Sequence, residues 1–184
     1  MIAVLVLIGI ILVLAVWAVG IYNSLVRNRN LVKEGWSGME VQLKRRADLI
    51  PNLIETVKAY MGHERGVLEK VTELRAQSLH TGSVEERAKL EGALSRSLAS
   101  LFAVAEGYPD LKANQNFLDL QTQLSQLEEQ IQMARRYYNG TVRDYNIRVE
   151  SFPSNLVARG FAFKQAEFFE IAEETDRAVP TVSF

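Results

Sequence analysis

The first 22 residues of this 184-residue chain contain no charged side chain, and the first charge is that of Arg27. A helix rises ~1.5 Å per residue, so this run extends roughly 33 Å and can cross a ~30 Å hydrocarbon layer once. No later segment is both as long and as apolar. The sequence therefore predicts one membrane anchor, residues 1–24, that carries a water-exposed body.

A cleaved signal peptide and a buried core helix are the two alternatives for this segment. A signal peptide needs a basic n-region, a shorter apolar stretch and a small-residue cleavage site. No Lys or Arg precedes this run, and Ala15 and Ala18 bracket the bulky pair Val16-Trp17. We therefore expect an uncleaved anchor, whose terminal Trp17 and Tyr22 favour the headgroup layer.

Basic residues follow the anchor at once, at Arg27, Arg29 and Lys33, and none precedes it. The positive-inside rule then places the N-terminus outside and the C-terminal domain in the cytoplasm, although the α-amino group weakly opposes this. The basic membrane-proximal end also favours contact with anionic lipid headgroups.

With a net charge of −1 and no recognition motif, nucleic-acid binding is not expected, and the lack of cysteine excludes disulfides and thiolate chemistry.

Apolar residues recur with heptad spacing after the anchor, which indicates a long packed helix. The two seams contain Trp36, Leu43, Ile50, Val57, Glu64 and Val71, and Met39, Arg46, Leu53, Tyr60, Val67 and Leu74. We expect this helix to run from about Tyr22 to Gln77, either continuous with the anchor or separated from it. Pro51 lies inside the pattern and removes a backbone donor, so we expect a kink there.

Turn and capping signals divide the remaining chain. His80-Thr81-Gly82 is a predicted turn, and Ser83 with Glu86 forms a capping box that begins a second helix. This helix ends at the breaker Gly107-Tyr108-Pro109. A third helix is predicted from near Leu111 to Phe152-Pro153, and a shorter fourth from Leu156 to about Ile171.

These segments predict an all-α fold: an N-terminal transmembrane helix followed by a long antiparallel up-down helical bundle of three long helices and a shorter fourth. The bundle domain is expected at residues 25–173. An acidic C-terminal tail follows at residues 174–184, and we expect it to be loosely ordered. A strand added to the sheet edge of a partner is the alternative for this tail.

Several sequence blocks occur in order along the body. They are Tyr22–Asn30, Val41–Leu53, Glu55–Lys58, His63-Glu64, Tyr108–Asn114, Asn116-Phe117, Ala134–Asn139 and Ser151–Pro153. Together they resemble the LemA family of bacterial membrane proteins. The resemblance implies a single anchor in the bacterial cell (inner) membrane and a long antiparallel helical bundle, and it implies no settled reaction. Gly35 and Gly38 flank Trp36-Ser37 where the family usually has Ala and Gln, and Glu129-Gln130 replaces a common Asn-Arg pair.

The polar residues do not form a recognisable catalytic, cofactor or metal site. His63-Glu64 is followed by Val67 where a helical zinc site has its second histidine, and the other histidine is His80. The cluster Gly62–Gly66 lies within a helical period and is not a phosphate loop. We therefore expect no catalytic residues, no cofactor and no metal.

Arg46 and Glu64 are unusual because they interrupt otherwise apolar seams. One interpretation is that their stems pack while their charges reach the bundle edge. The other is a buried network with Asp48, Glu55 or Arg135 that fixes helix register, since a buried charge needs a partner. The candidate structural network therefore comprises Arg46, Asp48, Glu64 and Arg135.

Four C-terminal aromatic residues, Phe161, Phe163, Phe168 and Phe169, are too dense to all face solvent. They either cap the end of the bundle or form an interface, as a helix that docks on another subunit or on the membrane surface.

The leading functional hypothesis is a membrane-anchored helical scaffold that acts through self-association and binding of an unidentified protein partner. Membrane lipids contact residues 1–24, and a homo-oligomer is expected because Gly9 and Gly20 allow uncharged anchors to gather. The alternative is a signalling or regulatory adaptor at the bacterial cell membrane whose helices change register around Pro51. An enzyme with an unrecognised site is a third hypothesis.

Overall fold

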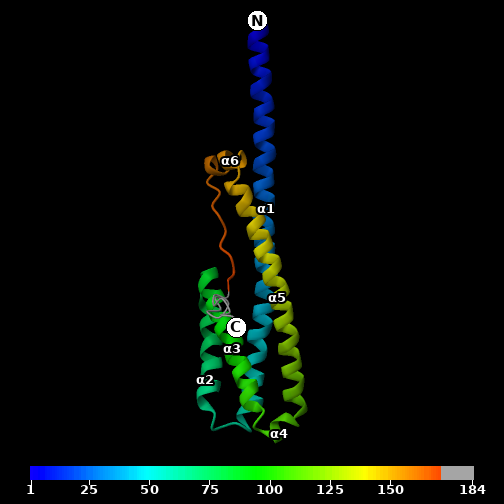
Figure 1. Cartoon of the computed structure of the whole chain (residues 1–184), viewed down its shortest axis with the longest axis vertical. Helices are drawn as coiled ribbons and strands as arrows, with labels where there is room; N and C mark the ends of the chain where they lie inside the picture. The colour runs from blue at the N-terminus through cyan, green and yellow to red at the C-terminus, as the bar shows by residue number, and fades with distance from the viewer. Residues whose placement is uncertain (171–184) are drawn as a thin grey trace, which may run out of the picture. The chain divides into compact units, whose positions relative to one another are not determined.

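Helices joined by short turns make up most of the computed structural model, which describes residues 1–170 (Figure 1). They are α1 (Ile2–Lys58), α2 (Arg65–His80), α3 (Val84–Ala105), α4 (Pro109–Lys112), α5 (Gln115–Glu150) and α6 (Ser154–Gly160). The described residues contain no strand. The predicted all-helical class with an apolar N-terminal helix is confirmed, whereas the predicted tail at residues 174–184 lies outside the described residues.

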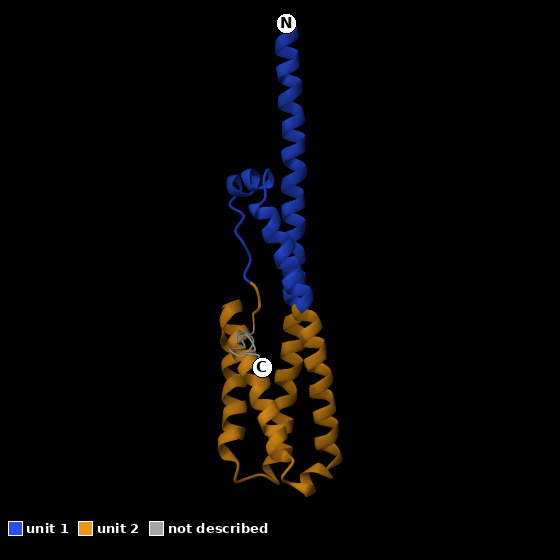
Figure 2. Ribbon diagram, viewed as in Figure 1, with its two compact units in different colours: residues 1–38, 136–167 blue, residues 39–135, 168–184 orange. Residues whose placement is uncertain are grey.

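The chain divides into two units, and both α1 and α5 contribute to each (Figure 2). Unit 1 contains Met1–Gly38 and Arg136–Glu167. Unit 2 contains Met39–Arg135 and, within the described part of the chain, residues 168–170. The apolar run and the first body helix are one continuous helix, α1. The predicted domain boundaries after residues 24 and 173 stay predictions.

Unit 2 is built around one apolar core shared by the C-terminal part of α1, by α2 and α3, and by the N-terminal part of α5. Short turns join these helices, so that neighbours in sequence run antiparallel (Figure 1). Heptad positions of α1 fill this core, as the sequence predicts. Its buried residues include Ile50, Leu53, Val57, Met61, Leu68, Val71, Leu74, Leu94, Leu98, Leu101, Leu111, Phe117 and Leu124.

The predicted helix from Tyr22 to Gln77 is wrong, because α1 ends at Lys58 and residues 59–64 form a turn. The amides of Tyr60 and Met61 both donate to the Val57 carbonyl, at 3.0 and 2.9 Å. Met61 is fully buried in the core, and Gly62 lies in the turn itself, where its low helix propensity favours the break. The glycine cluster Gly62–Gly66 therefore spans the turn and the start of α2 instead of lying within one helix.

Pro51 lies inside α1 with its ring exposed, and the helix continues through it. The expected kink at this residue stays a prediction.

The ends of α3 and α5 follow from local capping. Ser83 Oγ accepts from the Glu86 amide at 3.1 Å, as predicted, while the Glu86 carboxylate accepts from the Thr81 hydroxyl at 2.8 Å. The third long helix begins at Gln115 and not near Leu111, because α4 intervenes. Asn114 Oδ1 accepts from the Phe117 amide at 3.1 Å and so caps α5.

In unit 1, residues of α1 pack against the C-terminal part of α5 with a close approach at Gly35. A Cβ added to Gly35 would lie 3.3 Å from both Thr141 Oγ1 and Tyr138 Cα, whereas a Cβ on Gly38 would meet nothing within 4 Å. The rings of Trp36 and Tyr138 pack edge-on, with centroids 5.5 Å apart. Gly35 therefore sets the spacing of the two helices.

The predicted fourth helix, Leu156 to about Ile171, is wrong beyond Gly160. Its end is a Schellman motif, in which the Phe163 amide donates to the Ala158 carbonyl at 2.9 Å and the Ala162 amide to the Arg159 carbonyl at 3.3 Å. Ala162 has φ 55°, the left-handed conformation that favours glycine. Residues 163–167, called the strap below, continue along unit 1 without helical structure.

Candidate functional site

The most unusual polar residue of unit 2 is Arg46, which α1 carries into the core. Its side chain is only 2% exposed, and its helical neighbours Leu43, Ala47 and Ile50 are also buried. The heptad pattern of α1 forces this placement, because Arg46 occupies a position on the apolar face. A guanidinium in such surroundings needs both charge compensation and hydrogen-bond acceptors.

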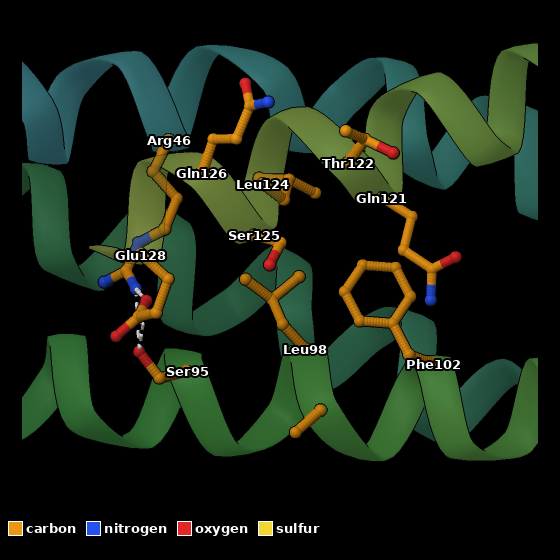
Figure 3. A pocket seen from close by; sticks show the side chains of 11 residues that line it. Arg46, Ser95, Leu98, Phe102, Gln121, Thr122, Leu124, Ser125, Gln126 and Glu128 are labelled. Atoms are coloured by element: carbon orange, nitrogen blue, oxygen red, sulfur yellow. Dashed lines mark hydrogen bonds and ion pairs between the residues drawn. The ribbon is translucent and has the colours of Figure 1, made fainter. Parts of the chain in front are cut away.

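Side chains from α3 and α5 supply these acceptors. Arg46 Nη1 donates to Ser95 Oγ at 2.7 Å and to Glu128 Oε2 at 2.6 Å. Arg46 Nη2 forms an ion pair with Glu91, whose side chain is 3% exposed. The Ser95 hydroxyl also donates to Glu128 at 3.3 Å. One guanidinium thus joins three helices, and Figure 3 shows its contacts with Ser95 and Glu128.

Further contacts of Glu91 and Glu128 surround the guanidinium of Arg46. The charge cluster is defined here as Arg46, Arg87, Glu91, Ser95 and Glu128. Arg87 Nε donates to Glu91 Oε1 at 3.1 Å, one helical turn away on α3. Two cations therefore balance two carboxylates. Glu128, 37% exposed, also accepts from the amide of Gln132 at 3.2 Å. With its formal charges balanced and its carboxylates paired, the charge cluster is suited to holding helices in register.

Two buried polar atoms on α1 lie beside the charge cluster in sequence. Arg46 Nε and Gln42 Oε1 have no hydrogen-bond partner among the described residues. One is a donor and the other an acceptor, and they are one helical turn apart.

A groove of about 590 Å³ opens next to the charge cluster, between α3 and α5. Figure 3 shows Leu98 and Phe102 of α3 on one side of the groove and Gln121 and Ser125 of α5 on the other. Arg46 and Glu128 line it as well. Among the described residues, the ionisable side chains in its lining are these two, and they are paired with each other.

Among the described residues, no hydrogen bond or ion pair joins Asp48, Glu64 or Arg135 to Arg46 or to one another. Asp48 is exposed on α1 and Arg135 is half-buried on α5. Glu64 accepts from the Tyr108 hydroxyl at 3.2 Å near the turn after α1. Burial, followed by the hydrogen bond and negative charge of Glu64, raises the pKa of Tyr108. Arg46 does enter a buried network, but its partners are the residues of the charge cluster.

Sequence reasoning missed Glu91 and Glu128 because each lies far from Arg46 along the chain. Glu91 lies three residues before Leu94 and seven before Leu98, so it interrupts the apolar stripe of its helix as Arg46 interrupts its own seam. This interruption and the four-residue spacing of Arg87 and Glu91, a pair that can meet on the surface of a helix, were the local signals.

Metal-ligating side chains do not gather in the described part of the chain. No group of three or more His, Cys, Asp or Glu residues there could hold a metal ion. His63 and His80 are both exposed.

The four C-terminal aromatic residues have different surroundings. Phe161 and Phe163 pack on Tyr22 of α1, with ring centroids 4.8 and 5.7 Å from it. Phe163 also lies under the Arg29 guanidinium, 5.0 Å from the ring centre, a cation–π contact. In unit 2, Phe169 is buried while Phe168 stays partly exposed.

Polar side chains of α5 hold the backbone of the strap. Tyr138 and Tyr145 donate their hydroxyls to the carbonyls of Glu167 and Lys164, at 2.8 and 2.9 Å. Asn146 donates to the Ala166 carbonyl and accepts from the Ala166 amide, both at 2.9 Å. Tyr145 and Asn146 follow Tyr138 by seven and eight residues, so the three side chains lie on one face of α5. This spacing was the available sequence signal for a polar docking face.

The surroundings of the two tyrosines shift their ionisation. Burial, with a smaller contribution from the charge of Glu167, raises the pKa of Tyr138 to about 12. Burial also raises the pKa of Tyr145, against an opposing effect of Arg29. Both hydroxyls therefore remain protonated donors at neutral pH.

Comparison with known proteins identifies relatives along most of the chain. The model of the LemA family matches residues 35–184. Protein LemA of Metamycoplasma hominis is 27% identical over 163 residues, covering 84% of this chain and 71% of that protein. Magnetosome protein MamQ 2 of Paramagnetospirillum magneticum is 24% identical over 186 residues, covering 87% of this chain and 68% of that protein. Magnetosome protein MamQ of Magnetospirillum gryphiswaldense is 22% identical over 186 residues, with the same coverage.

Proposed function

Because the chain belongs to the LemA family, we propose that it is a membrane-anchored helical scaffold that acts by self-association and by binding a protein partner, without catalysing a reaction. One N-terminal helix is long and apolar enough to cross a membrane, which fits a membrane protein. We propose in addition that this helix anchors the chain in the membrane, that the chain self-associates and that its body binds a protein partner.

The observation that carries the proposal is the exposure of the apolar run in α1. None of the most apolar 18-residue stretch of this helix is buried, although Leu5, Ile11 and Val16 are large apolar residues. Leaving a Val, Leu or Ile side chain in water instead of burying it costs about 1.5–3 kcal/mol. Summed over some twenty residues, this cost requires lipid or other copies of the segment to cover it.

The orientation that we propose follows from the charges beside the anchor. Arg27 and Arg29 come first after the apolar run, and both are exposed on α1. Basic residues remain on the cytoplasmic side during insertion. We therefore place the N-terminus outside and the body in the cytoplasm of a bacterial cell, at its inner membrane.

Self-association is supported by the anchor itself. Gly9 and Gly20 are eleven residues apart, which is close to three helical turns, so they lie on the same face of α1. A Cβ at either position would meet nothing within 4 Å among the described residues. Small residues on one face let membrane helices approach closely.

The absence of catalysis in the proposal rests on the chemistry of unit 2. Its charge cluster is balanced, and each of its charges has a partner within the described residues. A site of this kind stabilises the packing of α1, α3 and α5 and leaves no unpaired base poised for proton transfer. The groove beside it, mixed in polarity, is then a surface for partner contact and not a reaction centre.

The molar mass of the full-length protein in a mild detergent tests the scaffold proposal. Light scattering coupled to size exclusion should give a discrete oligomer whose population rises with protein concentration. The double variant Gly9→Leu/Gly20→Leu should dissociate at higher concentrations than the wild type, whereas Val16→Leu, a matched change of an exposed anchor residue, should not. A monomer at every concentration contradicts self-association.

A further inference from the structure

The region around α6 in unit 1 exposes large apolar side chains next to the end of the apolar run. Phe152 is 79% exposed and Leu156 is 59% exposed, and Phe161 is also exposed. The opposite side of α6 packs inward through Ala158, which is buried. Scattered exposed apolar residues are common, but here Leu156 lies in one seven-residue helix and Phe152 and Phe161 flank it.

Contacts within unit 1 place α6 at the end of the anchor. Ser154 at the start of α6 lines a niche of about 310 Å³ together with Trp17 and Ile21 of α1. Arg148 of α5 also lines this niche and donates to Ser24 Oγ at 2.8 Å. The apolar run ends at Tyr22, in the same turns of α1. Figure 1 shows α6 beside α1, with the rest of the apolar run extending past it.

The charges around α6 match a layer of lipid phosphates. Residues 145–164 contain three cations, Arg148, Arg159 and Lys164, and one anion, Glu150. All four are exposed, and Glu150 is occupied by a hydrogen bond from Gln165. Exposed apolar side chains combined with basic residues are the composition of segments that lie in the membrane interface.

We infer that α6 and its flanking residues form a membrane foot, defined by Phe152, Leu156, Arg159 and Phe161, that lies in the headgroup layer of anionic phospholipids. Phe152, Leu156 and Phe161 enter the boundary between headgroups and acyl chains, and Arg159 pairs with phosphate. The contact of Phe161 and Phe163 with Tyr22 ties the foot to the anchor. The foot fixes the orientation of unit 1 on the bilayer, which one spanning helix alone leaves free to rotate and tilt.

This inference rests on the proposed function, because the foot meets lipid only if the apolar run of α1 crosses the bilayer. The test must therefore report on the anchor and on the foot separately. The chain has no cysteine, so single-cysteine variants can each carry one environment-sensitive fluorophore. Val13→Cys reports on the anchor, and Leu156→Cys reports on the foot.

Tyr137→Cys is the matched control for the foot. Tyr137 is 52% exposed in unit 1, close to the exposure of Leu156. It lies eleven residues before Arg148 on α5, so it is about 16 Å farther from the anchor along the helix. Circular dichroism of each labelled full-length variant verifies that the helices are intact.

The labelled proteins are placed in phosphatidylcholine–phosphatidylglycerol vesicles that contain nitroxide-bearing phospholipids. The expected result is a blue-shifted emission and strong quenching by the lipid nitroxide at positions 13 and 156, and neither at position 137. If position 13 is quenched while position 156 has the emission of a water-exposed probe, the foot is wrong and the anchor stands. If position 13 is not quenched, both the anchor and the foot are wrong.

Two further outcomes separate the membrane from other partners. A label at position 156 that is shielded from aqueous iodide but not quenched by lipid nitroxide means that protein covers α6, which overturns the inference. The variant Arg159→Gln should reduce quenching at position 156 in vesicles containing phosphatidylglycerol and not in pure phosphatidylcholine. Equal quenching of the variant and the parent in both lipids overturns the role of anionic headgroups.

Discussion

Replacing Arg46 with Met tests whether the charge cluster holds unit 2 together. Methionine keeps an unbranched apolar stem, so the substitution mainly removes the guanidinium. Breaking a buried ion pair from one side costs about 3–5 kcal/mol, because the other charge stays buried without its partner. Glu91 keeps Arg87 at 3.1 Å, and Glu128 is exposed enough to be hydrated. We therefore expect the lower end of that range, about 3 kcal/mol.

Thermal unfolding of the full-length protein in detergent, followed by circular dichroism, measures this loss. For a chain of this size 1 kcal/mol shifts the Tm by about 2–4 °C, so Arg46→Met should lower the Tm by about 6–12 °C. Arg45→Met is the matched control, since Arg45 is exposed on the adjacent position of α1, and it should change stability by at most ~0.5 kcal/mol.

A second substitution tests the cause of the destabilisation. Adding Glu91→Gln to Arg46→Met removes the stranded carboxylate, so the double variant should recover part of the lost stability. This non-additivity is expected for two residues in direct contact. If Arg46→Met is no less stable than Arg45→Met, the charge cluster does not support the fold, and the reasoning is refuted.

Three further predictions, tested with five substitutions, apply the same unfolding measurement to unit 1. Gly38→Ala should stabilise the protein by up to ~1 kcal/mol, because alanine has the higher helix propensity. Gly35→Ala should destabilise the protein, because the added methyl group lies 3.3 Å from the α5 backbone. Equal changes in stability for the two variants contradict the close approach of the helices at Gly35. Burial raises the pKa of Tyr138 to about 12, whereas in the unfolded chain this residue ionises near its ordinary value of 10.0. The free energy of unfolding of the wild type relative to Tyr138→Phe should therefore fall as the pH rises between these two values. A difference that stays constant with pH argues against the burial. Ala162→Gly should stabilise the protein by about 0.5–1 kcal/mol, because glycine adopts the left-handed conformation without steric strain. Gly160→Ala should not lower the stability, since Gly160 is not in that conformation. Lower stability of Gly160→Ala without higher stability of Ala162→Gly would mean that α6 ends differently.

The apolar periodicity of the sequence predicts the helices well and their ends less well. Ile50, Val57 and Val71 keep one heptad phase, in which the polar Glu64 is the exception, yet a turn separates Val57 from Val71. The reason is that antiparallel helices both present apolar stripes to one core, so the phase alone does not distinguish one long helix from two. The glycines at positions 62 and 66 were the local signal, and Met61 shows why the break is tolerated, because it remains buried in the turn.

The candidate site was only half predictable for a related reason. Arg46 stands out in the sequence because it interrupts an apolar seam. Its partners are 45 and 82 residues away and are chosen by how three helices come together, which no local pattern encodes. The strap was missed because it lies in an aromatic-rich segment, Leu156 to about Ile171, that suggested a helix, whereas the polar face of α5 binds the strap backbone in a non-helical conformation.

The behaviour of the full-length chain without detergent tests the central claim, that the apolar run of α1 belongs in a membrane. Flotation with liposomes should carry the protein to the lipid fraction and keep it there after alkaline carbonate washing. In plain buffer, sedimentation velocity should show only large assemblies that cover the apolar segment. Single molecules that stay dispersed in plain buffer would contradict the account.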